Sequence, residues 1–153
     1  MSRLSAYALC GALALYVAIS VGTMAFAADS VAPVRLDRNK IAGLGLTPVP
    51  PDAYADILVG GKLNIRVAPL FTGKELRASI FESTPAKTDH RTRPNDTDEF
   101  VLVLSGKLIL TEPNGTAQEF LPGDSLVLPV GYTGTWEMQG NYRELAVTAK
   151  KGK

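Results

Sequence analysis

The fold is decided by two stretches of the chain, Asp98-Glu99-Phe100-Val101-Leu102-Val103-Leu104-Ser105-Gly106 and Gly123-Asp124-Ser125-Leu126-Val127-Leu128-Pro129-Val130-Gly131. Each is an apolar run rich in Val and Leu that ends in glycine, which is typical of a β-strand leading into a turn. Residues 100–104 are apolar on both faces, so a sheet with one solvated face does not explain them. One face must line an interior, and the other must be covered.

The rest of the chain from Asp56 onward also consists of strand-like segments that end in turn residues. Short β-rich segments alternate with turn residues about every 8 to 12 positions, which predicts an all-β sandwich or barrel. We expect strands at residues 57–59, 63–67, 76–82, 100–104, 107–111, 117–120, 125–128, 134–138 and 143–148. Asn114-Gly115 can supply the positive φ values of a tight hairpin turn between the strands at 107–111 and 117–120. Residues 104–107 are expected to turn the preceding strand into this hairpin.

Residues 1–27 have the pattern of a secretory signal peptide. Arg3 is their only charged residue, an apolar run follows, and Ala25-Phe26-Ala27 provides an A-x-A cleavage site. A membrane anchor is the alternative, but glycine and serine interrupt the run, which is near the lower length limit for a span. We therefore expect cleavage before Ala28, a periplasmic or secreted protein, and no membrane association after cleavage.

The mature chain divides into an arm and a single β domain. Residues 28–55 are rich in Pro and Gly and predict an irregular arm with at most a helical turn near residues 38–43, while residues 56–150 carry the strands. The only cysteine, Cys10, lies in the signal segment, so no disulfide is expected. Removing Arg3 from the 16 basic residues leaves 15 against 15 acidic ones, and this balance gives no basis for nucleic-acid binding.

The spacings in the two quoted stretches, Glu-x6-Gly and Gly-x5-Pro-x-Gly, resemble the two signature motifs of the cupin superfamily (RmlC-like). Residues 77–150 are similar to the subfamily that includes ureidoglycine aminohydrolase-like domains and EutQ-like proteins, with matches at Phe81–Pro85, Phe120–Asp124 and Gly134–Glu137. The resemblance implies a single cupin double-stranded β-helix, a jelly-roll barrel, preceded by the arm.

The resemblance also locates the metal ligands that this chain lacks. Metal-binding cupins use three histidines and a glutamate, and the histidine positions fall here on Thr92/Arg93, Pro94/Asn95 and Gly134. None of these side chains can replace an imidazole, so only Glu99 remains of the set and we predict neither metal nor cofactor. His90, with Asp89, Asp96 and Asp98, could still form an improvised metal site; otherwise residues 88–96 are a solvated loop.

The candidate ligand-binding residues are Glu82, Glu99, Tyr132 and Trp136. If Glu99 points inward, as the resemblance implies, alternation also sends Val101 and Val103 inward. Trp136 either stacks on a ligand or fills the core. Glu82 and Glu99 could act as a pair of carboxylates, and Tyr132 could satisfy a buried glutamate.

Three functions are compatible with these residues. The first is a metal-free, exported cupin that binds a small molecule in its barrel. The second is an enzyme of the lyase, isomerase or aminohydrolase type that uses carboxylates or a non-standard metal site, although one histidine and no mature cysteine exclude a Ser-His or Cys-His pair. The third is a structural dimerisation module. A homodimer is expected from the outward side chains Phe100, Leu102 and Leu104, unless the arm covers them.

Overall fold

The computed structural model describes residues 32–150, so the predicted signal segment at residues 1–27 lies outside the described residues. One helical turn and nine strands follow each other in this part of the chain. They are α1 (Arg38–Ile41), β1 (Thr47–Pro48), β2 (Leu58–Gly61), β3 (Ile65–Thr72), β4 (Leu76–Ser83), β5 (Ala86–Asp89), β6 (Glu99–Thr111), β7 (Ala117–Phe120), β8 (Ser125–Leu128) and β9 (Thr135–Ala149). Among residues 32–150, no helix is long and apolar enough to cross a membrane.

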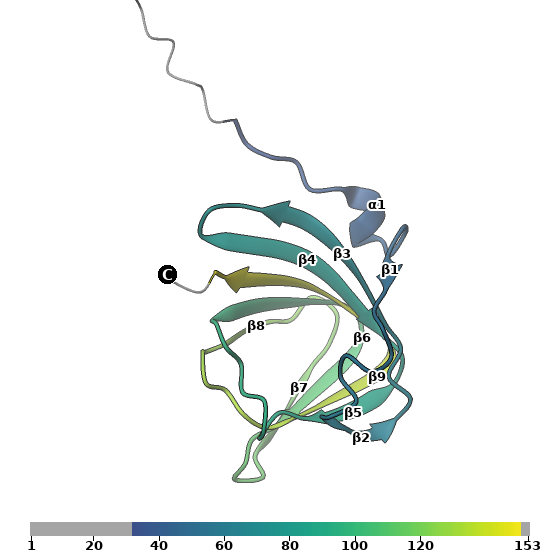
Figure 1. Cartoon of the computed structure of the whole chain (residues 1–153), viewed down its shortest axis with the longest axis vertical. Coiled ribbons are helices and arrows are strands. Elements are labelled where there is room, and N and C mark those ends of the chain that lie inside the picture. Colours follow the sequence, from purple (N-terminus) through teal and green to yellow (C-terminus); the bar gives the residue numbers. More distant parts are fainter. Residues whose placement is uncertain (1–31, 151–153) are drawn as a thin grey trace, which may run out of the picture. The chain divides into compact units, whose positions relative to one another are not determined.

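The strands form one antiparallel sheet that curls into a barrel (Figure 1). The first part of β6 pairs with β8 and with the end of β9, whereas its second part pairs with β7 and with the start of β9. β4 and β5 add to the other edge of β9, and β3, β2 and β1 extend the sheet from there. The predicted all-β jelly-roll fold is confirmed.

Two predicted pairs of strands are each one long, bent strand. The sequence predicted a turn at residues 104–107, but β6 runs through it with register shifts at Val103/Ser105 and Ser105/Lys107. Gly106 has φ +72°, and a Cβ there would lie 2.6 Å from the Gln139 carbonyl oxygen, so the two strands cross at a distance that only glycine allows. β9 likewise bends near Gly140 and is continuous. A bulge bends a strand without ending it, and a sequence pattern does not distinguish the two.

Among the other strands, one predicted hairpin is confirmed, one strand lies later than predicted, and one strand was not predicted. The hairpin of β6 and β7 is confirmed, with Gly115 at φ +90° in its turn. β3 lies at Ile65–Thr72, later than the predicted 63–67, and β5 was not predicted. β5 matters for function because it leads directly into His90.

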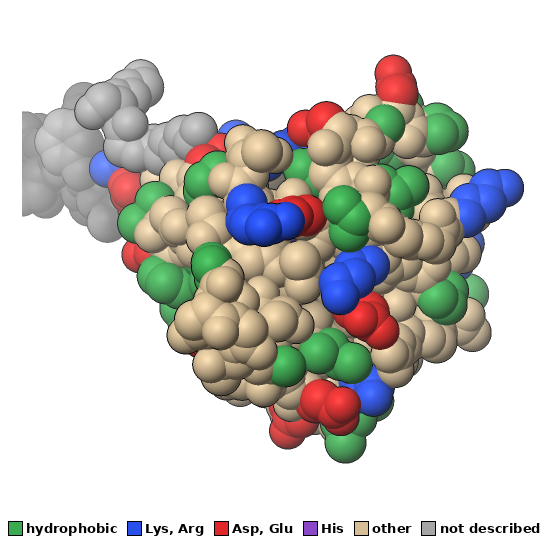
Figure 2. All heavy atoms as spheres, turned by 90° about the horizontal axis from the view of Figure 1, so that it is seen from below, with side chains coloured by type: hydrophobic (Ala, Val, Ile, Leu, Met, Phe, Trp, Pro, Cys, Tyr) green, Lys and Arg blue, Asp and Glu red, His purple; other side chains and the backbone are tan. Residues whose placement is uncertain are grey.

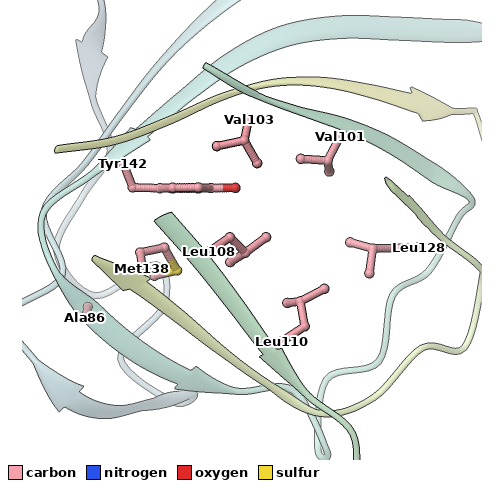
Figure 3. Packing of buried hydrophobic residues seen from close by; sticks show 8 residues of the cluster. All are labelled: Ala86, Val101, Val103, Leu108, Leu110, Leu128, Met138 and Tyr142. Atoms are coloured by element: carbon pink, nitrogen blue, oxygen red, sulfur yellow. The ribbon is translucent and has the colours of Figure 1, made fainter. Parts of the chain in front are cut away.

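The main core fills part of the barrel interior. Val101 and Val103 of β6 are 0% and 1% exposed, which confirms that this face points inward. Figure 3 shows them converging with residues of β5, β8 and β9 on the space around the Tyr142 ring. The buried residues of this cluster are Ala86, Val101, Val103, Leu108, Leu110, Leu128, Met138 and Tyr142.

The arm covers part of the outer face of the sheet. Asp37 caps α1 by accepting a hydrogen bond from the Asn39 N–H at 2.8 Å. Behind α1, Leu46 is buried with Ala68 and Ile80, and Leu104 packs against this second cluster. β1 also pairs with β3, so the arm adds a strand to the sheet that residues 56–150 alone were expected to form.

The remaining outer strip is uncovered. Phe100, Val127 and Leu76 are 39%, 65% and 41% exposed, and Phe100 is paired with Val127 across β6 and β8. Together with Val147 and Ala149 they line a shallow apolar groove, here called the outer strip. On the face in Figure 2, by contrast, basic and acidic side chains are interspersed without a patch of one sign.

We propose that the outer strip pairs with a second copy of the chain, because exposed apolar strips of this kind favour self-association. Val127→Glu should convert a dimer into a monomer in light scattering, since it places a charge in the apolar contact. Val59→Glu is the matched control: Val59 is also exposed, at 59%, but lies on β2 away from the strip, so this variant should remain dimeric. A monomeric unaltered protein at tens of micromolar would contradict the proposal.

Candidate functional site

The barrel is not completely filled by its core. A cavity of about 300 Å³ lies beside the core cluster, between the barrel strands and the loop that links β5 to β6. Its apolar walls include Ile57, Ile65, Phe81 and Met138. Its polar walls are formed by Thr88, His90, Arg93, Asn95, Asp96, Glu99, Trp136 and Glu144. Apolar walls with a few convergent polar groups are the usual composition of a small-molecule site.

Glu144 is the most deeply buried ionisable group of this cavity. β9 alternates so that Tyr142, Glu144 and Ala146 face inward, and Glu144 lies opposite Val103 of β6. The Glu144 side chain is 4% exposed, and its Oε2 accepts a hydrogen bond from the Tyr142 hydroxyl. The ring of Tyr142 holds this hydroxyl toward the barrel interior (Figure 3).

The protonation of Glu144 follows from this burial. Burial raises the pKa of Glu144 to about 8, the hydrogen bond from Tyr142 lowers it in part, and the nearby charge of Glu99 raises it again. Burial and the Glu144 carboxylate also raise the pKa of the Tyr142 hydroxyl, so Tyr142 remains a hydrogen-bond donor. At neutral pH the barrel therefore holds a protonated carboxyl group next to a tyrosine.

Glu99 is the second carboxylate of the cavity, as the resemblance implied. It begins β6, and its Oε2 accepts a hydrogen bond from the Asn95 amide at 3.4 Å. Burial raises the pKa of Glu99, against the effect of the Asn95 hydrogen bond, and the charge of Asp96 adds to the rise. The cavity thus brings together two carboxyl groups from β6 and β9.

His90 lies in the cavity wall. The interpretation of residues 88–96 as a solvated loop is therefore wrong for His90. The end of β5 directs it inward, because the His90 N–H donates to the Gly134 carbonyl at 2.8 Å. Its Nε2 is 3.1 Å from Thr88 Oγ1, and its ring lies 5.2 Å from that of Trp136. Burial lowers the pKa of His90, so the imidazole is neutral at pH 7.

The two predicted aromatic residues occupy different places. Trp136 lines the cavity, and its buried Nε1–H has no acceptor among the described residues. Tyr132 packs against the core instead, and its buried hydroxyl has no partner there either, so it does not satisfy Glu99. The tyrosine that meets a buried glutamate is Tyr142.

Glu82 does not belong to the cavity. It lies on the opposite face of β4, where Arg66 Nε and Arg143 Nε donate to its carboxylate at 3.0 and 2.8 Å. Burial would raise the pKa of Glu82, but the two arginines outweigh burial and hold it below the usual range. The predicted pair of Glu82 and Glu99 is therefore wrong, because alternation along β4 turns Glu82 outward, and Glu144 takes its place.

Glu144 and His90 were only weakly indicated as cavity residues by the sequence pattern. Residues 143–148 alternate Arg-Glu-Leu-Ala-Val-Thr, so both faces of the strand mix polar and apolar side chains and the pattern does not decide which face is inward. His90 reaches the cavity through β5, a strand that the pattern did not show. Long-range pairing with β9 decides both positions.

The described residues do not fit the metal site of the superfamily. At Gly134, a Cβ would lie 2.5 Å from the Thr111 carbonyl oxygen, so a histidine side chain would need the backbone to shift. The acidic neighbours of His90 are engaged elsewhere: Asp89 pairs with Arg91, and Asp98 accepts the Val130 N–H at 2.9 Å. Within residues 32–150, no three His, Cys, Asp or Glu side chains are grouped as metal ligands.

Comparison with known proteins agrees with this fold. Residues 72–144 match the family model of the EutQ-like cupin domain. A protein of unknown function from Pseudomonas syringae pv. tomato is similar in structure, with 25% identity and a TM-score of 0.59 over 67% of this chain and 43% of that one. This chain therefore spans less than half the length of that protein. The comparison with curated proteins finds no match.

Two further solved structures share the fold at lower identity. The EutQ protein of Clostridium difficile is 16% identical, with a TM-score of 0.53 over 76% of this chain and 80% of that one. A cupin superfamily protein from Desulfitobacterium hafniense is 16% identical, with a TM-score of 0.50 over 77% of this chain and 100% of that one.

The curled antiparallel sheet and its two bent central strands give the chain the jelly-roll fold of cupin proteins. Residues 72–144 of this fold match the EutQ-like cupin domain, so the resemblance seen in the sequence is confirmed.

The burial of Glu144 predicts a pH-dependent stability that Glu144→Gln removes. The folded-state pKa of about 8 lies above the ordinary value of 4.5. Between these values the unfolded carboxyl ionises while the folded one keeps its proton, so the free energy of unfolding falls as pH rises. Urea unfolding should show Glu144→Gln close to the unaltered protein near pH 5 and more stable near pH 9, by on the order of 3 kcal/mol.

Glu119→Gln is the control for this comparison. It removes the same charge from β7, where the Glu119 side chain is 59% exposed, and its stability should follow that of the unaltered protein at both pH values. Equal free energies of unfolding for Glu144→Gln and the unaltered protein near pH 9 would show that the Glu144 carboxyl group does not lower stability at high pH.

Proposed function

We propose that this protein is an exported cupin that binds one small molecule in its barrel without a metal ion. The observation that carries the proposal is the cavity of about 300 Å³, in which ionisable and aromatic side chains meet apolar walls. This volume is at the lower end of the range for ligand sites, which extends from about 300 to 1,000 Å³. A cavity of about 150 Å³ already accepts a benzene ring, so a ligand of one ring or a short chain fits.

The cost of the polar groups supports binding over a purely structural role. A filled structural barrel would be more stable with apolar residues at Glu99 and Glu144, because each buried carboxyl group loses its hydration and gains only one hydrogen bond from a neutral side chain. The Trp136 Nε1–H is also buried without an acceptor among the described residues. A ligand with a hydrogen-bond acceptor would satisfy this donor.

The metal-free part of the proposal is supported by the ligand positions. The first two histidine positions of the resemblance fall on Thr92/Arg93 and Pro94/Asn95, of which Arg93, Pro94 and Asn95 line the cavity wall, and Gly134 leaves no room for the third. Protein purified without affinity-tag metals should contain only trace transition metal in elemental analysis. Stoichiometric metal that is lost in both Glu99→Gln and His90→Ala would contradict this and favour an enzyme with a non-standard metal site.

A second candidate function is proton transfer on the bound molecule. The specific observation in its favour is a protonated Glu144 in the same cavity as Glu99 and the neutral imidazole of His90, because an acid and a base with separated pKa values can act on one substrate. A ligand recovered without deuterium at any carbon after long incubation with the protein in D2O would favour binding alone.

Binding in the cavity should be visible in the fluorescence of Trp136, the only tryptophan of the chain. We expect at least one compound in a screen of small metabolites to change its emission, and Glu99→Gln to weaken that compound because it removes a polar contact. Val59→Glu changes an exposed side chain that does not line the cavity, so this variant should bind normally. If no compound perturbs Trp136, the cavity serves no ligand and the structural role is favoured.

Export rests on residues 1–27, whose single charge, apolar run and A-x-A site form a signal peptide pattern. Intact-mass analysis of protein from the periplasm or medium should give a chain that begins at Ala28. Recovery of the uncleaved chain in the membrane fraction would replace export with anchoring.

A further inference from the structure

Two of the three carboxyl groups that line the cavity, Glu99 and Glu144, are hydrogen-bonded by neutral groups. Glu99 accepts from the Asn95 amide and Glu144 from the Tyr142 hydroxyl. The basic side chain on the cavity wall, Arg93, is engaged at the rim: its Nη1 donates to the Ala53 carbonyl at 3.1 Å and lies 3.4 Å from Asp56 Oδ1. No cation of the described residues is recorded within ion-pair distance of Glu99 or Glu144.

Two independent features show that the two carboxyl groups face a space for a ligand and are not only an acidic cluster. The first is the cavity itself, which both Glu99 and Glu144 line. The second is its aromatic wall: the ring centroids of Trp136 and His90 lie 5.2 Å apart, and the two rings are tilted by 33°. A tryptophan face also attracts organic cations.

We infer that the cavity binds a small organic ammonium ion, whose charged group contacts Glu144 and Glu99 and whose apolar part lies against Trp136. This inference rests on the proposed function, because it names the class of ligand for the same cavity. The ammonium group supplies up to three donors to the carboxyl oxygens, and hydrogen bonds between charged groups are about twice as strong as neutral ones.

When the ammonium ion binds, it replaces the proton of the Glu144 carboxyl group. Since burial holds the pKa of Glu144 at about 8, the empty cavity keeps this carboxyl protonated at pH 7. An ammonium ion beside it favours the ionised form, so the Glu144 proton leaves for the solvent as the ligand enters. The net charge of the cavity is unchanged by the exchange, which avoids burying an uncompensated charge.

Other titratable groups face this site and can contribute to its pH dependence. Tyr142 on β9 donates a hydrogen bond to Glu144, and the charge of Glu99 on β6 raises the pKa of Glu144, whereas β4 presents the apolar Phe81 at the paired position. His90 and Asp96 line the same cavity, and Arg93 is at its rim. The experiment therefore separates Glu144 from these groups by substitution.

The test compares ligands that share a ring and differ in charge. Benzylamine, benzyl alcohol and benzoate, and the cyclohexyl set of amine, alcohol and carboxylate, are titrated calorimetrically and by Trp136 fluorescence. We expect each amine to bind about tenfold more tightly than its alcohol. Amine affinity should rise by about tenfold between pH 6 and pH 7, with release of about one proton per amine at pH 7.

The variants assign the effect to the cavity. Glu144→Gln should reduce the preference for amine over alcohol to about twofold or less and abolish the proton release. Glu119→Gln removes an equal charge outside the cavity and should leave both unchanged. Thermal unfolding of each variant shows whether it is folded. If Glu144→Gln fails to fold, Tyr142→Phe is used in its place, because it removes the hydrogen bond to the Glu144 carboxyl group. Tyr142→Phe should then change the number of protons released when the amine binds.

The outcomes separate the two proposals. If alcohols or carboxylates bind as tightly as the amines, or if the amine preference survives in Glu144→Gln, the ammonium inference is wrong while the cavity remains a binding site. If none of the compounds binds, the ammonium inference is overturned, and the metabolite screen alone decides whether the cavity binds another class of molecule.

Discussion

The pairing of β6 with β9 is the constraint on which the rest of the structure depends. Both strands continue through a bend, at Gly106 and Gly140, and they cross there with the Gly106 backbone against Gln139 and Tyr142. The crossing lets each half of β6 pair with different neighbours, β8 on one side of the bend and β7 on the other. A side chain at Gly106 would force the strands apart, so the closure of the barrel requires a residue without a Cβ at this position.

The same pairing creates the site. The register of β6 against β9 sets Val103 opposite Glu144, and Glu99 begins the same inward face of β6. β5 adds to the other edge of β9 and brings His90 against Trp136. Three segments distant in sequence thus supply the ionisable groups of one cavity. The core cluster around Tyr142 fills the neighbouring space, and it fixes the hydroxyl that Glu144 needs in its buried position.

Carboxyl groups on the two faces of the sheet have pKa values shifted in opposite directions. On the outer face, Arg66 and Arg143 hold Glu82 ionised, and the pair is partly solvated, so this cluster ties β3, β4 and β9 together at modest electrostatic cost. Inside the barrel, Glu144 has a tyrosine as partner and keeps its proton near neutral pH. A buried carboxyl group with a raised pKa lowers the stability of the fold at higher pH. Groups with strongly shifted pKa values are concentrated at functional sites.

The sequence alone determined the all-β class, the cupin motifs, the inward face of Val101 and Val103, and the absence of histidine at the usual ligand positions, because strand alternation and motif spacing are local properties. It also identified Glu99 and Trp136, which lie in or beside those motifs. Only the tertiary structure decided that Glu82 faces outward, that Glu144 and His90 enter the cavity, and that the arm covers Leu104. These features depend on register and bends between distant strands. A one-residue change of register reverses the side of every side chain, and no local pattern in a strand with two mixed faces fixes that choice.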